Sequence, residues 1–249
     1  MVEPEASSTP VASTPWLVRW LDEVDSTNRY ALDEARAGTP AGLVVVAEHQ
    51  TAGRGRLGRT WVAPPGASLL MSVLLRPDLP VEARHLVVVA GALAMAEAVE
   101  VETGVRVGLK WPNDLLVGDR KLAGILAEAT GDAVVVGIGV NLHWEDVPAE
   151  LTEIATACNL EGGRPTTREA VLTGFLAGYA ARLADLDRTR ADYEARLVTV
   201  GRRVRVEQAA TVLVGEARGI DASGHLLVRT DAGEDETVAV GDVVHLRAE

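Results

Sequence analysis

Apolar runs separated by polar breaks predict an α+β domain over residues 15–198. Short apolar runs between turn residues predict strands at residues 16–24, 43–47, 67–75, 105–111, 115–117, 121–129 and 133–142. Capping residues and longer apolar stretches predict helices from Asp25 or Ser26 to residue 35, over residues 81–102, from Thr167 to residue 186 with Thr166 or Thr167 as cap, and on to about residue 197. We expect the alanine-rich helix of residues 81–102 to cross beneath a mixed sheet.

The pattern changes after Gly201, where short β-branched runs alternate with turn residues. The runs predict strands at residues 204–206, 211–214, 226–230, 237–240 and 243–246. Short strands of this kind are typical of a small β-barrel. We therefore expect a small C-terminal domain at residues 199–249, which follows the large domain in the chain. Residues 1–14, which lack apolar periodicity, are expected to be a flexible tail.

Composition and charge exclude several classes of protein. The 24 basic residues against 36 acidic ones give a net charge of −12, whereas a general nucleic-acid binder is expected to be basic. No apolar run approaches the roughly 18 residues of a membrane span, and the first residues lack the order of a signal peptide. We expect a cytoplasmic protein with no membrane partner. Its single cysteine, Cys158, is expected to be buried and to take no part in chemistry.

Residues 48–66 form a polar segment with four glycines and two consecutive prolines, and they are expected to be a long mobile loop without regular structure. Residues 53–59, Gly-Arg-Gly-Arg-Leu-Gly-Arg, here called the arginine-glycine loop, match the glycine spacing of a dinucleotide-binding turn. We reject that interpretation, because such a turn must open a helix and the prolines follow too soon. A loop that binds phosphate or carboxylate, an RNA-binding segment and a solvated loop remain as interpretations.

The chain has only two lysines, Lys110 and Lys121. Coding bias towards arginine removes lysine wherever a guanidinium suffices, so these two are candidates for positions that need a compact ammonium. Lys110 opens Lys-Trp-Pro-Asn-Asp, for which a surface turn is the alternative, and Lys121 opens Lys-Leu-Ala-Gly-Ile-Leu. Asn141, in Gly-Ile-Gly-Val-Asn-Leu, is either a ligand contact or a turn residue. Trp61 is either a lid anchor or a face on which a base stacks.

These motifs resemble, in order and spacing, those of the biotin protein ligase family. They include Asp-Ser-Thr-Asn at residues 25–28, Glu-His-Gln-Thr-Ala at residues 48–52 running into the arginine-glycine loop, and the three motifs at Lys110, Lys121 and Asn141. The resemblance implies a mixed sheet with packed helices, like a class II aminoacyl-tRNA synthetase catalytic domain, and a C-terminal SH3-like β-barrel. It implies that biotin and ATP, with Mg²⁺, give biotinyl-5′-AMP. Biotin then passes to a lysine of the biotin carboxyl carrier domain of an acyl-CoA carboxylase.

The resemblance also implies roles for individual residues. It implies biotin-binding residues at Ser26, Thr27, Asn28, Gln50, Arg54, Gly55, Arg56, Lys121 and Gly124. It implies ATP-binding residues at Arg54, Arg56, Arg59, Trp61, Lys110, Asn113, Lys121 and Asn141. Catalysis is implied for Arg54, Arg56 and Lys121, and no residue is assigned to a metal. We hypothesise that Asp114 receives or orients the proton of the acceptor lysine, the alternative being that it caps the turn.

The start of the sequence departs from the bifunctional members of that family. Residues 1–14 leave no room for a DNA-binding head, so we expect a ligase that does not bind DNA. Two alternatives remain: a lipoate or octanoate ligase, which shares the fold, and a non-enzymatic module that binds a small ligand or RNA. We expect either a monomer or a homodimer.

Overall fold

The computed structural model describes residues 8–10, 16–145, 147, 151–208 and 211–246. Its centre is an eight-stranded sheet in the order β1-β2-β3-β4-β8-β7-β6-β5. The strands are β1 (Ser8–Pro10), β2 (Leu17–Val24), β3 (Leu43–Gln50), β4 (Ser68–Leu75), β5 (Gly108–Lys110), β6 (Asp114–Val117), β7 (Arg120–Thr130) and β8 (Ala133–Asn141). β2 and β3 are parallel, and the other neighbours are antiparallel. The expected mixed sheet is confirmed.

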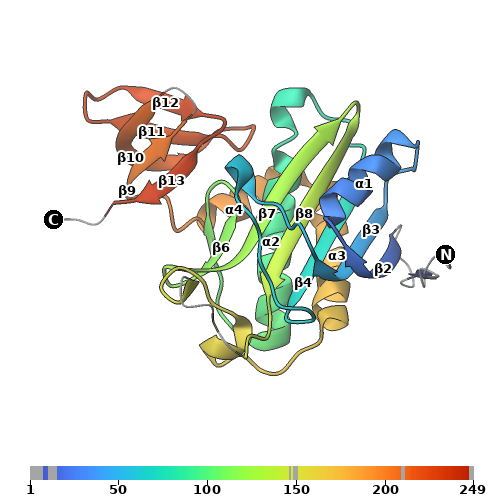
Figure 1. The fold of residues 1–249 in the computed structure, drawn as a ribbon. Helices are drawn as coiled ribbons and strands as arrows, with labels where there is room; N and C mark the ends of the chain where they lie inside the picture. Colours follow the sequence, from blue (N-terminus) through green and yellow to red (C-terminus); the bar gives the residue numbers. More distant parts are fainter. Residues whose placement is uncertain (1–7, 11–15, 146, 148–150, 209–210, 247–249) are drawn as a thin grey trace.

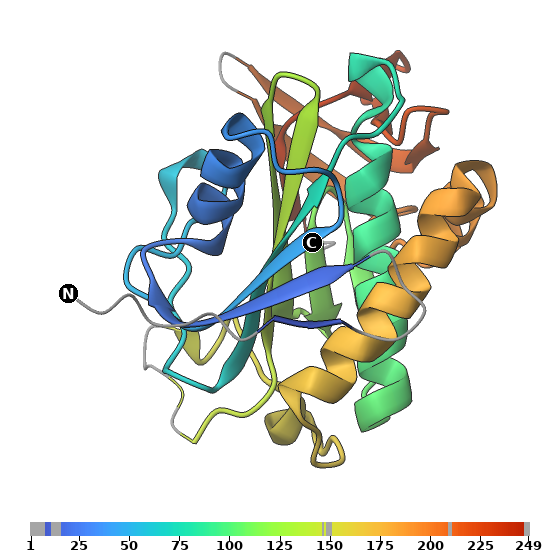
Figure 2. The same cartoon turned by 90° about the vertical axis from the view of Figure 1, so that its right-hand side faces the viewer.

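Helices cover both faces of the large sheet. α1 (Thr27–Arg36) lies on one face, whereas α2 (Leu86–Thr103) and α3 (Arg168–Ala184) lie on the other (Figure 2). α4 (Leu186–Ala195) follows α3 and contacts α2. The Thr167 side chain accepts a hydrogen bond from Ala170 N, which confirms it as the cap of α3. α1 has only 10 residues, and the site described below lies at its start, on the same face of the sheet.

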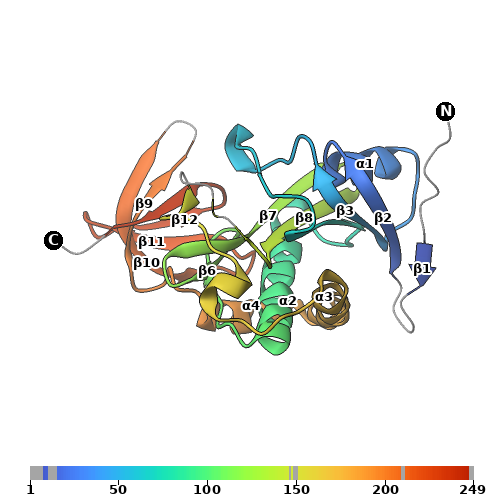
Figure 3. The same cartoon turned by 60° about the horizontal axis from the view of Figure 1, so that its bottom comes forward.

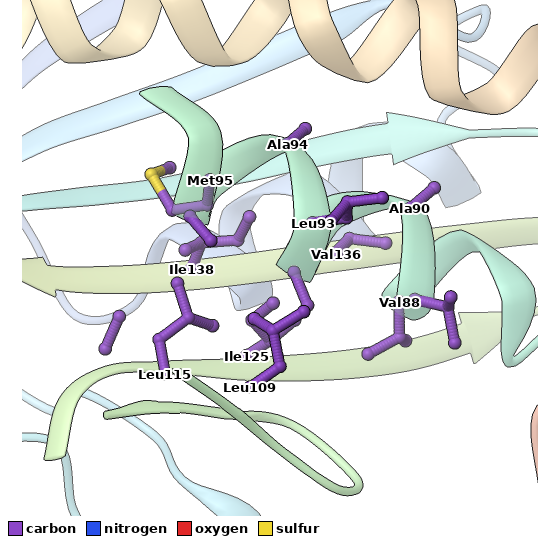
Figure 4. Close-up of a cluster of buried hydrophobic side chains, with 14 of the residues drawn as sticks. Val88, Ala90, Leu93, Ala94, Met95, Leu109, Leu115, Ile125, Val136 and Ile138 are labelled. Carbon is purple, nitrogen blue, oxygen red and sulfur yellow. The ribbon is translucent and has the colours of Figure 1, made fainter. Parts of the chain in front are cut away.

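Strand side chains alternate between two cores, as the pleat of a β-strand requires. Along β8, Val134, Val136 and Ile138 belong to the core that packs on α2 (Figure 4), whereas Ala133 and Val135 pack with α1. In α2, 14 of the 18 residues are buried, because the helix lies between the sheet and the other helices. This burial explains why α2 has no polar face in the sequence.

The predicted boundaries are wrong in the polar segment of residues 48–66. β3 does not end at Ala47 but continues to Gln50, pairing His49 with Glu23 and Gln50 with Val24 of β2. Backbone pairing with a neighbouring strand outweighs the polar side chains, which are only partly buried there. The extension carries Gln50 to the N-terminus of α1.

A second sheet follows the last helix and forms a separate lobe beside the first (Figures 1 and 3). Its antiparallel strands, in the order β12-β11-β10-β9-β13, are β9 (Arg203–Glu207), β10 (Val212–Ile220), β11 (Leu226–Thr230), β12 (Asp235–Val238) and β13 (Asp242–His245). β12 and β13 are the two edges and do not pair within the described residues, so the expected closed barrel is not found. Short apolar runs predict strands but do not determine whether the edge strands meet.

At the start of the chain, residues 1–7 and 11–14 of the predicted tail lie outside the described residues. Ser8–Pro10 form β1, which pairs antiparallel with β2. In the described part of the chain, no helix is long and apolar enough to cross a membrane.

His85 lies where the two lobes meet. Its ring is 6.2 Å from the ring of Trp111, whose indole NH donates to the carbonyl of Gly224 in the second lobe at 3.0 Å. The His85 Nε2 is buried without a hydrogen-bond partner among the described residues. This burial, with the nearby charges of His225 and Arg56, lowers the pKa of His85 to about 4.

The free energy of unfolding is therefore expected to fall as the pH drops from 7 to 5. The unfolded imidazole gains a proton near pH 6.5, but the folded one only near pH 4, so protonation favours the unfolded chain. We expect His85 to account for a loss of about 2 kcal/mol, measured by urea unfolding at both pH values. His85→Leu should flatten this dependence, leaving the part due to His245, whose pKa burial also lowers to about 4. An equal loss in parent and variant would exclude His85 as the cause.

Candidate functional site

A pocket of about 420 Å³ opens on the α1 face of the large sheet. This volume is in the range of small-molecule sites. The pocket is built from the start of α1, the arginine-glycine loop, β6 to β8 and the start of β13. The predicted site residues in its wall are Ser26, Thr27, Asn28, Gln50, Arg54, Gly55, Arg56, Arg59, Trp61, Asn113, Asp114, Lys121, Gly124 and Asn141.

Lys110 is the one predicted site residue that the structure does not bring to this wall. It ends β5, and its charge lowers the pKa of His245 in the second sheet. Neighbouring positions of a β-strand and the following turn point in different directions, so a shared motif does not place Lys110 with Asn113 and Asp114. The contact of Lys110 with ATP stays a prediction.

Glycines of β8 make room for the pocket. On the face of the sheet that carries α1, the first residues of β8 pack under the helix. The later residues on the same face, Gly137, Gly139 and Asn141, line the pocket. A Cβ atom at Gly137 would lie 2.0 Å from Asn28 Oδ1, and one at Gly139 would lie 2.6 Å from the Trp61 ring. Both positions therefore exclude a side chain. Two glycines in an otherwise apolar strand are a sequence signal for a close approach, although no role was predicted for Gly137 or Gly139.

The start of α1 forms a buried polar end of the pocket. Thr27 N donates to Gln50 Oε1 at 2.8 Å, so the Gln50 side chain satisfies an amide at the helix start. Ser72 of β4, which the sequence motifs did not reveal, donates to Asn28 Oδ1 at 2.6 Å and lies 2.8 Å from the Thr27 hydroxyl. Ser26 is the N-cap residue, but its side chain makes no capping hydrogen bond. Its hydroxyl can therefore serve a ligand.

The arginine-glycine loop is a compact turn that, as expected, contains no α-helix or β-strand. Arg54 and Thr60 form an antiparallel bridge, and Arg56–Gly58 make one 3₁₀ turn. Leu57 has φ 56°, in the left-handed region that leucine rarely occupies. The next α-helix of the described chain begins only at Leu86, which confirms the rejection of a dinucleotide-binding turn. The mobility of the loop stays a prediction.

Glu128 of β7 and Asn113, in the turn between β5 and β6, hold two arginines of the loop. Arg54 lies 2.9 Å from the carboxylate of Glu128 on β7. Arg56 donates to Asn113 Oδ1 at 3.0 Å. Burial lowers the pKa of Arg56, although nearby carboxylates oppose the shift. Because arginine stays charged in proteins, a bound anion would compensate for this burial.

The second sheet also reaches the pocket. Arg56 donates to the carbonyl of Gly241 at 2.9 Å, and Arg59 pairs with the carboxylate of Asp242 at the start of β13. Asp242 is a wall residue that the sequence motifs missed. Arg59 and Asp242 are 183 positions apart in the chain, and no local pattern relates them. The arginine-glycine loop is therefore anchored on both lobes.

Lys121 lies at the centre of the charged part of the pocket. Its Nζ is 2.6 Å from Asp114 Oδ1 and 5.7 Å from the centre of the Trp61 ring. Four cationic side chains line the wall, namely Arg54, Arg56, Arg59 and Lys121. Only two carboxylates of the described residues, those of Asp114 and Asp242, line it with them. The pocket is thus locally cationic in a chain of net charge −12. Fixed cations at one point suit a ligand with two negative groups.

A free thiol does not explain the site. Burial raises the pKa of the Cys158 thiol to about 11, which keeps it neutral, and Cys158 is buried as expected. Among the described residues there is no group of three or more histidine, cysteine, aspartate and glutamate side chains that could hold a metal ion.

Comparison with known proteins agrees with this arrangement. The model of the biotin/lipoate A/B protein ligase family matches residues 20–143, and that of the biotin protein ligase C-terminal domain matches residues 199–246. The biotin--[acetyl-CoA-carboxylase] ligase of Mycobacterium tuberculosis is 40% identical to this chain, over 95% of this chain and 92% of that protein. The chain belongs to the biotin protein ligase family.

Other members of the biotin protein ligase family show how far the similarity extends. The structure of biotin protein ligase from Aquifex aeolicus in complex with biotin and ATP has a TM-score of 0.80 and 30% sequence identity, and the match covers 93% of this chain and 99% of that one. The bifunctional ligase/repressor BirA of Bacillus spizizenii is 35% identical over 66% of this chain. The match spans about half, 53%, of the length of that protein.

Proposed function

We propose that this chain activates biotin with ATP, forming biotinyl-5′-AMP and pyrophosphate, and then transfers biotin to a lysine of the biotin carboxyl carrier domain of an acyl-CoA carboxylase. One observation carries the proposal: Lys121 and the three arginines of the loop converge on a pocket whose other end is polar but uncharged. The relatives named as biotin ligases support the same reaction.

The charges of the pocket fit the first step. A carboxylate must attack the α-phosphorus of ATP, and two anions approach each other only where fixed cations offset their repulsion. In the protein alone, Lys121 pairs with Asp114 and Arg59 with Asp242, which keeps the cations in place before the substrates bind. Mg²⁺ would arrive with the nucleotide phosphates, since it keeps water and phosphate ligands and needs few protein groups.

The uncharged end of the pocket fits the ring system of biotin. The Ser26 hydroxyl and the side chains of Thr27 and Gln50 can pair with a polar, uncharged head in a largely apolar slot. The product of the first step is a mixed anhydride that water destroys. An arginine-glycine loop closed over it excludes water until the acceptor lysine enters.

Asp114→Asn is expected to slow the transfer of biotin about 100-fold, because an amide cannot take up the proton of the acceptor amine. Adenylate formation should fall less, by about tenfold, through loss of the ion pair with Lys121. Single-turnover experiments measure the two steps separately. If both rates stay at the wild-type level, Asp114 is only a turn residue.

The proposed function is tested by supplying ATP and Mg²⁺ with biotin, lipoate or octanoate and following pyrophosphate release. Release is expected with biotin alone, and a carrier domain added afterwards should gain the mass of one biotinyl group. Release with lipoate instead would indicate a lipoate ligase. Ligand binding without turnover, together with salt-sensitive affinity for RNA, would indicate a non-enzymatic module.

We also propose that the large sheet has the class II aminoacyl-tRNA synthetase-like architecture, that the second sheet is SH3-like, and that the domains meet at residues 198 and 199. The separate matches at residues 20–143 and 199–246 support this division. Limited proteolysis that cuts near residue 199 and releases two stable fragments would support it further. Sedimentation would distinguish a monomer from a homodimer.

A further inference from the structure

We propose that Glu128 is a positioning residue that joins the polar end of the pocket to the arginine-glycine loop. The inference deepens the proposed function, because it assumes that biotin occupies the polar end. Glu128 lies on β7, on the face of the sheet that carries α1, and its side chain is 22% exposed. It is absent from the roles that the sequence motifs imply.

The two carboxylate oxygens of Glu128 serve two different elements. Oε1 lies 2.9 Å from the guanidinium of Arg54 in the loop. Oε2 accepts a hydrogen bond from Asn28 Nδ2, at the start of α1, at 3.0 Å. The Glu128 side chain thus bridges the arginine-glycine loop and the start of α1. Among the described residues, these two segments make no direct side-chain hydrogen bond with each other. A charged acceptor makes both contacts stronger than neutral ones would be.

Asn28 transmits this contact into the protein interior. One proton of its amide goes to Glu128 and the other to the carbonyl of Leu126, at 3.1 Å, while its oxygen accepts from Ser72 at 2.6 Å. The amide oxygen also packs closely on Gly137, where an added Cβ atom would lie 2.0 Å from it. Both amide protons of Asn28 are used within the protein, so Asn28 orients the polar end instead of donating to biotin.

This network couples the two ends of the pocket. The Arg54 side chain is 46% exposed, and its carboxylate partner among the described residues is Glu128. A ligand that fixes the start of α1 also fixes Glu128 and hence Arg54, and by linkage a ligand that fixes Arg54 favours the same α1 geometry. Biotin bound at the polar end would therefore favour the closed position of the loop.

Glu128→Gln tests this coupling, because glutamine has the same size but replaces one carboxylate oxygen by an NH2 group, which as a donor cannot accept from Arg54 or from Asn28 Nδ2. In the protein without ligand, trypsin should cleave after the loop arginines about fivefold faster, since the loop opens more often. The KM for biotin should rise about tenfold while kcat changes by less than about twofold. Asp231→Asn, which removes the exposed pair with Arg203 outside the pocket, is the control and should leave both readouts unchanged.

Unchanged cleavage and unchanged KM in Glu128→Gln would overturn the proposal. A raised KM without faster cleavage would overturn it as well, because Glu128 would then act on Asn28 alone. If the glutamine variant does not fold, Glu128→Asp keeps the charge but is too short to reach both partners, and the same two changes are expected. The cleavage assay needs no turnover. If wild-type protein releases no pyrophosphate with biotin but the variant is still cleaved faster, the proposed function fails and the bridge by Glu128 stands.

Discussion

Lys121→Met is expected to lower the rate of biotinyl-5′-AMP formation by about 100- to 1000-fold, the usual cost of removing one fixed electrostatic group from an active site. Methionine keeps most of the length and the apolar stem of lysine but cannot offset the repulsion between carboxylate and phosphate. Lys121 lies in the pocket wall with its ammonium 2.6 Å from Asp114. Single-turnover formation of the adenylate, without an acceptor, measures the effect.

The chain offers a matched control for this prediction. Lys110 is the only other lysine, and it lies outside the pocket wall. At saturating ATP, Lys110→Met should therefore change the rate by less than about twofold, since it removes the same charge from outside the pocket wall, and loss of the predicted contact with ATP would appear as a raised KM for ATP. Equal losses in the two variants would show that overall charge, and not the position of the Lys121 ammonium, determines the rate.

Gly137→Ala is expected to lower kcat/KM for biotin by about 100-fold, since displacing a site by about 1 Å can cost that much. The added methyl group would lie 2.0 Å from Asn28 Oδ1, where no atom fits, so Asn28 must move and lose its hydrogen bond from Ser72. The measurement is biotin-dependent pyrophosphate release at varied biotin concentration.

Gly178→Ala in α3 is the control for Gly137→Ala. The nearest side-chain atom to its added methyl group would be Ala94 Cβ at 3.6 Å, an ordinary contact. Alanine also favours a helix interior over glycine. Activity and the thermal midpoint should therefore stay at or above the wild-type values. If Gly137→Ala behaved like this control, the close packing of Asn28 on β8 would have no part in binding biotin.

The elements that the sequence predicted well are those whose burial is visible in the local pattern of apolar residues. β4 and β8 are buried along their whole length and appear as continuous apolar runs, and α2 is enclosed between the sheet and other helices. β3 was predicted too short, because its last residues are polar and are held by pairing with β2. The closed barrel could not be judged from the sequence, since closure depends on how distant edge strands meet.

The site was predicted as far as its residues belong to motifs. Most motif residues meet in one pocket because the strand ends and loops that carry them lie at the same end of the sheet, but Lys110 shows that neighbours in a motif can point elsewhere. Ser72, Glu128 and Asp242 were missed. Each acts through a partner more than 40 positions away, and its residue type is common outside active sites. Such contacts require the folded structure.

The most direct test of cationic activation is mass analysis of the small molecules formed when the protein is mixed with ATP, Mg²⁺ and one equivalent of biotin, without an acceptor. Biotinyl-5′-AMP and pyrophosphate are the predicted products of the wild-type protein, with almost no adenylate from Lys121→Met over the same interval. No adenylate from the wild-type protein, or as much from the variant, would contradict the claim that Lys121 and the loop arginines join biotin to the nucleotide.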